Sequence, residues 1–151
     1  MLFRTHLAFS FLVFFLLWEF LEVEAEKWLF ALVFMISAVI VDIDSSKSVI
    51  GRFFKPVGWI FGHRFWLHSV FAALLISLLV GLVDANYSYA VFFGYLSHMV
   101  LDMLNHQGIA PFYPASAYRI KGPFKSDGLA EKIIFVACFL GIIFLGLLFS
   151  Y

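Results

Sequence analysis

Five apolar segments, separated by short polar stretches, constrain the fold of this chain more than any other feature. They comprise residues 2–18, 28–41, 67–83, 87–104 and 133–151. The 151 residues are 64% hydrophobic and only 13% charged, whereas soluble domains are about one quarter charged. Too little polar sequence remains to cover buried helices in a soluble protein. We therefore expect an all-α integral membrane protein, a single transmembrane domain over residues 1–151 with about five membrane-spanning helices.

These apolar segments are short for their task. A helix needs about 20 residues to cross the hydrocarbon of a bilayer. The second segment holds 14 unbroken apolar residues, which make a helix of about 21 Å. Its end therefore places Asp42 and Asp44 at or below the level of the lipid headgroups, where unpaired carboxylates are costly.

The distribution of lysine and arginine predicts the orientation. If the amino terminus is cytoplasmic, the outer segments hold only Lys27, and basic residues concentrate inside, as the positive-inside rule requires. The inner ones are Arg4, Lys47, Arg52, Lys55, Arg64, Arg119, Lys121, Lys125 and Lys132. We expect a multi-pass protein of a prokaryotic inner membrane with its carboxyl terminus outside. A cleaved signal peptide ending near Ala25 is the alternative, although the glutamates around that position are atypical.

Charge and cysteine content exclude other classes of function. Ten basic residues balance ten acidic ones, so no overall positive field would attract nucleic acid. The single cysteine, Cys138, excludes an internal disulfide and a cysteine-based zinc motif. The expected partner is membrane lipid.

The two predicted inner loops, residues 45–66 and 105–131, are rich in glycine and proline. This composition predicts irregular backbone at the cytoplasmic membrane interface. The histidines of the chain and three of its aspartates fall in segments on this same cytoplasmic side. They are His6, His63, His68, His98, His106, Asp42, Asp44 and Asp102. Ionisable groups at membrane depth are expensive, and each is a candidate functional residue.

His98 and Asp102 form the clearest pair, because a four-residue step places both on one helix face. An imidazole beside a carboxylate suits zinc, manganese or iron, although this pattern alone is weakly specific. Asp42 and Asp44 share a side only if the backbone between them is extended, which a turn would provide. They are candidate ligands, and a solvated helix end is the alternative. His68, at the mouth of the third segment, is the next candidate ligand.

Three further residues are candidates for catalysis. His63 is the preferred acid/base group, since an imidazole titrates near neutral pH. Arg64 and Arg119 could bind a phosphate by paired hydrogen bonds, although the positive-inside rule explains both without a function.

The motifs HRFWLHS (residues 63–69) and GYLSHMVLD (residues 94–102), with Thr5-His6 and Asp42-Ile43-Asp44, resemble the YdjM-like family. That family is described as LexA-regulated, membrane-bound, metal-dependent hydrolases. The resemblance covers residues 5–120 and departs from the expected pattern at Asn105, where we expect threonine. It implies a helical membrane protein that binds a divalent metal. The implied ligands are His6, Asp42, Asp44, His68, His98 and Asp102.

The leading hypothesis is a hydrolase in which one or two metal ions, zinc first and manganese or iron as alternatives, activate water to attack a phosphoester. A looser similarity to zinc-dependent phospholipases C implies a phospholipid headgroup as substrate, by analogy only. A metal or proton transporter is the main rival, but it requires polar residues in both halves of the spans. A third alternative is a non-catalytic membrane protein with a structural metal, or one that docks a cytoplasmic partner through its basic loops.

Overall fold

The computed structural model describes residues 2–18, 20–45 and 65–148. This part of the chain forms five α-helices and one short 3-10 helix, and it contains no β-strand. The elements are α1 (Phe3–Trp18), α2 (Lys27–Ile40), η1 (Val41–Asp44), α4 (Val70–Gly81), α5 (Ala85–Leu104) and α6 (Leu129–Leu148). The predicted all-helical fold is confirmed, and each helix lies on one of the five apolar segments.

Polar side chains set the starts of three helices. Glu26 accepts a hydrogen bond from the backbone N–H of Leu29 at the start of α2. Ser69 does the same for Ala72 in α4, at 3.2 Å, and Asp84 begins α5. Each cap satisfies a backbone donor that has no partner within the first turn of the helix.

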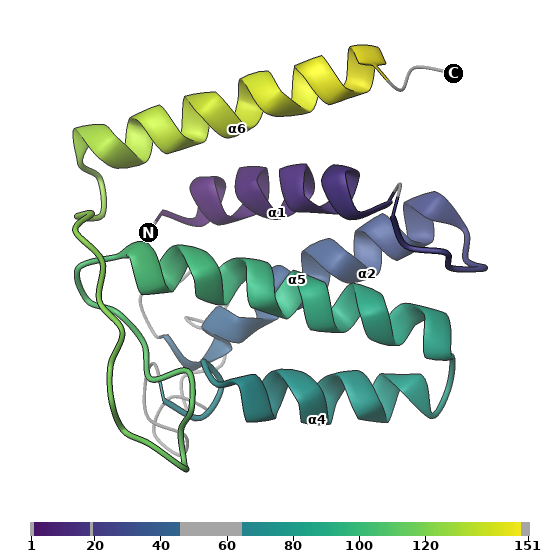
Figure 1. The fold of residues 1–151 in the computed structure, drawn as a ribbon, viewed down its shortest axis with the longest axis horizontal. Helices are drawn as coiled ribbons and strands as arrows, with labels where there is room; N and C mark the ends of the chain where they lie inside the picture. The colour runs from purple at the N-terminus through teal and green to yellow at the C-terminus, as the bar shows by residue number, and fades with distance from the viewer. Residues whose placement is uncertain (1, 19, 46–64, 149–151) are drawn as a thin grey trace.

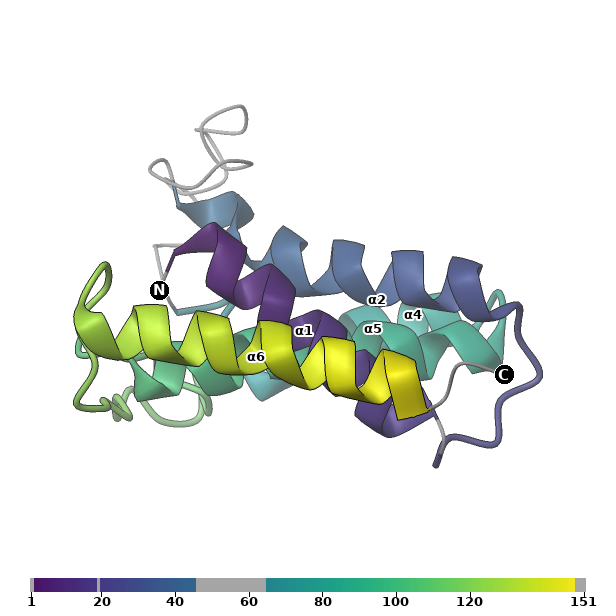
Figure 2. The ribbon, with the colours of Figure 1, turned by 90° about the horizontal axis from the view of Figure 1, so that it is seen from above.

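The helices lie side by side and alternate in direction (Figures 1 and 2). The central helix α5 packs against α2, α4 and α1, and α6 packs against α1. The start of α1, the end of α2, the start of α4 and the end of α5 therefore meet at one end of the bundle. We call this the site end. Helix α6 also begins there, and it ends at the opposite end.

Aromatic packing joins the helices in the opposite half of the bundle. The rings of Phe14, Phe30 and Phe34 are buried in one cluster, with centroids about 6 Å apart between α1 and α2. Gly94 of α5 lies directly against the backbone of α2, because an added Cβ would stand 2.3 Å from the carbonyl oxygen of Phe34. The absence of a side chain at this position sets how closely α2 and α5 approach.

The exterior of the bundle is apolar, and the buried part is mixed. Large hydrophobic side chains are exposed along the outer faces of α2, α4 and α6, and serine hydroxyls are buried between the helices. The exposed side chains include Trp28, Leu32, Ile36, Leu74, Leu75, Leu78, Leu79, Ile133, Val136, Phe139, Leu140 and Phe144. Such a surface suits a lipid environment better than water.

By length and composition, one described helix is sufficient to cross a membrane, namely α6 with 20 residues. The apolar helices α1 and α4 have 16 and 12 residues, which give about 24 Å and 18 Å at about 1.5 Å per residue. The hydrocarbon of a bilayer is about 30 Å thick. Length and apolar composition together thus support one of the five expected spans among the described helices.

Candidate metal centre

Four side chains from three segments converge at the site end. Asp42 lies on η1, directly after α2, and His68 lies two residues before α4. His98 and Asp102 occupy the last turns of α5 and share one of its faces, as their spacing predicted. One ligand atom from each of these four residues lies within 4.8 Å of the others. We call this group the acid–histidine centre.

The distances within the centre link each imidazole to both carboxylates. The Nε2 atom of His68 lies 3.7 Å from Oδ1 of Asp42 and 3.5 Å from Oδ2 of Asp102. The Nε2 atom of His98 lies 3.7 Å from each of these same two oxygens. Two nitrogens and two oxygens thus surround one point, and they come from three segments of the chain.

These separations fit shared ligands of one ion. Hydrogen bonds from nitrogen to oxygen are about 2.7–3.2 Å long, so the distances around His98 are too long for them. Two ligands about 2.1 Å from a tetrahedral zinc ion are about 3.4 Å apart. Neither ring nitrogen of His98 lies within hydrogen-bond distance of a partner among the described residues. An ion at the centre would satisfy a nitrogen that is otherwise costly to bury.

Three side chains of the centre are buried, and the fourth is partly exposed. The side chains of His68, His98 and Asp102 are at most 1% exposed, whereas that of Asp42 is 19% exposed. Burial raises the pKa of the Asp42 carboxyl, but the neighbouring His68 and His98 imidazoles outweigh it and hold that pKa below its ordinary value. Asp42 therefore carries a charged carboxylate at the exposed edge of the centre, where it could bind an ion.

Asp44 lies on the other side of the His68 ring. Its Oδ2 atom is 3.3 Å from Nδ1 of His68, and its side chain is fully buried. Because Nε2 of His68 faces Asp42 and Asp102, Asp44 contacts the nitrogen that points away from the centre. This is the usual place of a carboxylate that orients a metal-binding histidine and raises its basicity.

His6 lies beside the centre, at the start of α1. Its Nε2 atom is 3.4 Å from Oδ1 of Asp102. Its ring stacks on that of His98 with centroids 4.0 Å apart and an interplanar angle of 13°. The structure therefore brings together all six residues implied as ligands: four in the centre, with His6 and Asp44 in contact with members of it.

The three predicted catalytic residues do not all fall in the described structure. His63 and Arg64 lie outside the described residues. Arg119 is partly buried on the loop after α5, where its guanidinium carbon lies 4.6 Å from the centroid of the Phe65 ring. His106 is exposed at the end of α5 and is not part of the centre.

One polar residue that supports this region was missing from the sequence prediction. Glu131 of α6 is buried and accepts hydrogen bonds from the backbone N–H groups of Leu2 and Asp127. It thereby ties the segment before α1, and hence His6, to α6. A carboxylate at the edge of an apolar run is itself an expensive group, and this cost was the signal that could have identified it.

Asn105, the departure from the expected threonine, organises the loop after α5. Its amide nitrogen donates to Oγ of Ser126 at 2.8 Å, and its side-chain oxygen accepts from the N–H of Gln107. Its backbone carbonyl also accepts hydrogen bonds from the N–H groups of Gly108 and Gly122. The side chain holds the loop against the end of the helix that carries Asp102.

Comparison with known proteins places the chain in a family. The family model described as "YdjM inner membrane protein" matches residues 1–151. The chain is 32% identical over 107 residues to the uncharacterized protein YvsG of Bacillus subtilis, which covers 66% of each protein. It is 29% identical over 119 residues to the inner membrane protein YdjM of Escherichia coli, which covers 70% of the chain and 60% of that relative. No solved structure matches. The chain therefore belongs to the YdjM family of inner membrane proteins.

Proposed function

We propose that this protein is a membrane-embedded, metal-dependent hydrolase whose ion is held by the acid–histidine centre. The observation that supports it best is the convergence of two carboxylates and two imidazoles on one buried point, with nitrogen–oxygen distances of 3.5–3.7 Å. Oxygen and imidazole ligands suit zinc, and also manganese or iron. His6 and Asp102 could extend the same centre to a second ion.

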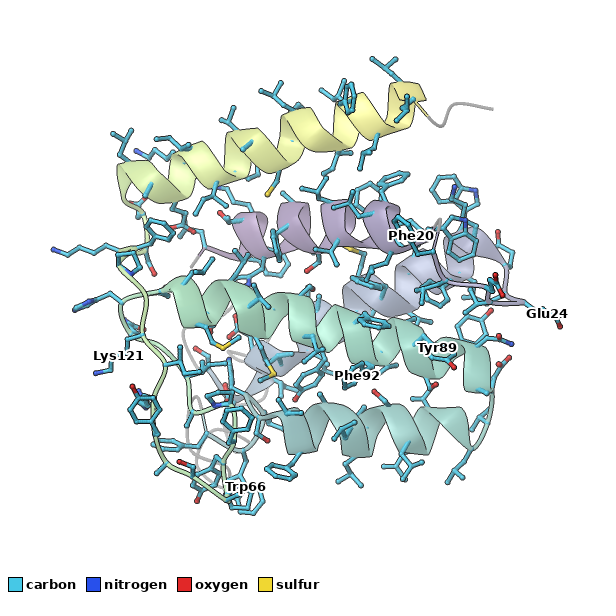
Figure 3. All side chains as sticks on the ribbon, in the orientation of Figure 1. Phe20, Glu24, Trp66, Tyr89, Phe92 and Lys121 are labelled. Carbon is cyan, nitrogen blue, oxygen red and sulfur yellow. The ribbon has the colours of Figure 1, made fainter. Side chains whose placement is uncertain are left out.

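We further propose that the bundle crosses the inner membrane five times with its site end in the cytoplasm. The apolar outer faces of α2, α4 and α6 support this arrangement, because they would lie in lipid. The short helices would be accommodated by local thinning of the bilayer. The distribution of charge agrees: Lys121 lies at the site end and Glu24 at the opposite end (Figure 3).

The chemistry follows from the ligand set and its exposure. A divalent ion in such a centre lowers the pKa of water and supplies a nucleophile at neutral pH. The exposed edge of Asp42 would admit a substrate, and a catalytic site requires such an opening whereas a structural site is closed. The outer partners Asp44 and His6 would hold His68 and Asp102 in place through the reaction.

A phosphoester at the membrane surface, such as a phospholipid headgroup, is the proposed substrate class. The site end carries Arg119, Lys121 and Lys125 on one loop, and it borders the lipid-facing surfaces of the helices. Arg119 would bind the phosphate while stacked on Phe65. His63 and Arg64 keep their proposed roles as acid/base and phosphate-binding groups.

Metal content and hydrolysis, measured on the same samples, test the proposal. The wild-type protein, purified in detergent, is compared with His98→Ala, Asp102→Ala and the control His106→Ala, which removes an exposed histidine outside the centre. We expect stoichiometric metal by mass spectrometry in the wild type and the control, and none in the other two variants. Release of phosphorylated headgroups from mixed micelles should follow the metal content.

Two results would count against this function. A folded wild type that takes up no metal after supplementation would show that the acid–histidine centre is not a metal site. A wild type that binds metal but hydrolyses no phospholipid or simpler phosphoester would favour a structural ion.

A further inference from the structure

His68 differs from His98 and Asp102 in the kind of backbone that carries it. His98 and Asp102 lie on a helix, which fixes the direction of their side chains, whereas His68 lies in the turn segment 65–69 before α4. A residue on such a segment keeps its orientation only if the surrounding backbone is anchored elsewhere. A metal ligand has to hold its orientation closely, since geometry determines affinity.

The segment around His68 is anchored at several backbone atoms. Ser69 donates a hydrogen bond to the carbonyl of Trp66 at 2.8 Å, and the N–H of Val70 donates to the carbonyl of Pro111 at 2.8 Å. The hydroxyl of Tyr95 donates to the carbonyl of Leu67. The last of these bonds ties the segment directly to α5, the helix that carries the other ligands.

The bond from Tyr95 acts on the peptide group of His68 itself. The carbonyl of Leu67 and the N–H of His68 belong to one planar peptide unit. A restraint on that oxygen restrains this plane, which includes the bond from the nitrogen to the Cα atom that carries the His68 side chain.

Tyr95 is well placed to act as a rigid reference. It is 1% exposed and packs in one cluster with Val41, Ala73 and Met99. It lies three residues before His98, on the face of α5 that also carries Asp102. Val41 directly precedes Asp42 in η1. Tyr95 thus packs in one cluster with the residue that precedes Asp42, and its hydroxyl binds the carbonyl of the residue that precedes His68.

We infer that Tyr95 is a positioning residue for the metal centre, whose hydroxyl sets the orientation of His68 through the carbonyl of Leu67. This inference rests on the proposed metal centre. A merely structural tyrosine would stabilise the fold to the same extent with or without metal. A positioning tyrosine changes how well the folded protein binds its ion.

The test compares Tyr95→Phe with the control Tyr89→Phe. Tyr89 lies on the same helix but is 48% exposed (Figure 3). Zinc affinity is measured by competition with a chromophoric chelator, on the monodisperse fraction from gel filtration, so that folding yield does not affect the result. We expect Tyr95→Phe to bind zinc about 10-fold more weakly or worse, and Tyr89→Phe to equal the wild type.

Two further measurements separate positioning from stability. The visible absorption of the cobalt(II)-loaded proteins reports the geometry of the ligands, and we expect it to change in Tyr95→Phe alone. Unfolding of the metal-free proteins is followed in parallel. Wild-type affinity and an unchanged cobalt spectrum in Tyr95→Phe, with a loss of metal-free stability only, would overturn the inference. A wild type that binds neither ion would overturn the proposed centre as well, so the two failures are distinguishable.

Discussion

At the scale of single residues, the ring of His68 separates the roles of two neighbouring aspartates. Asp42 faces Nε2 of His68 across the centre, and Asp44 faces Nδ1 from behind. We predict that Asp42→Asn loses stoichiometric zinc, because it removes a charged ligand. Asp44→Asn should retain binding but weaken it by about 10- to 100-fold, as expected of an outer partner.

Chelator competition on both purified variants measures this difference. Equal and complete loss of zinc in the two variants would instead make Asp44 a direct ligand, in agreement with the prediction from the sequence. A zinc affinity of Asp42→Asn equal to that of the wild type would show that Asp42 is not a metal ligand.

Residue spacing identified part of the centre and missed its supports. His98 and Asp102 could be paired from the sequence because a four-residue step on a helix is a local relation. The contacts of His68 with Asp42, Asp44 and Asp102 depend on how distant segments pack, which no spacing encodes. Tyr95 looked like any apolar core residue in a membrane helix, since nothing local reveals where its hydroxyl points.

At the scale of elements, apolar runs located all five helices, but the connections required the structure. From the sequence, Asp42 and Asp44 share a side only if the backbone between them is extended, whereas η1 is a 3-10 helix. In such a helix two residues differ by about 240° in direction, which lets the two carboxylates reach opposite edges of one imidazole. This geometry depends on tertiary contacts with His68 and cannot be inferred from three consecutive residues.

The approach of α2 to α5 gives a prediction at this same scale. Gly94→Ala places a methyl group 2.3 Å from the carbonyl oxygen of Phe34, a backbone atom that cannot move aside without shifting α2. We expect this clash to lower the free energy of unfolding by about 1–3 kcal/mol. Because α2 leads to Asp42 and α5 carries His98, we also expect weaker metal binding.

Thermal unfolding in detergent measures this effect, with Gly146→Ala as the control. Gly146 lies in α6 and has nothing within 4 Å of an added Cβ, so the change should be neutral or stabilising, as for glycine replaced within a helix. A Gly94→Ala protein as stable as the control would mean that the two helices are not in close contact.

At the scale of the whole molecule, the centre joins segments from across the chain. Its four residues come from η1, from the turn before α4 and from α5, and His6 adds the start of α1. An ion that binds only the folded protein stabilises it by mass action, by about 2.7 kcal/mol at 100 times its dissociation constant. We therefore predict that zinc raises the unfolding temperature of the wild type and that a chelator lowers it.

The comparison that checks this linkage is His98→Ala, whose unfolding temperature should respond to neither treatment. An equal response in both proteins would show that the ion acts elsewhere, at the surface or in the detergent. The size of the shift in the wild type then gives an affinity that can be compared with direct titration.

The arrangement of the helices in the membrane can be tested from the two ends of the bundle. Glu24 and Lys121 are both exposed and lie at opposite ends, and Cys138, the single cysteine, is replaced by alanine to give a clean background. In intact Escherichia coli cells, a membrane-impermeant maleimide should label Glu24→Cys. It should label Lys121→Cys only after the cells are broken, because the positive-inside rule places the basic loop in the cytoplasm. Labelling of both variants in intact cells would place both ends of the bundle on the same side and contradict a five-span topology. The reverse pattern would keep the spans but move the metal centre, and with it any substrate, to the outer surface.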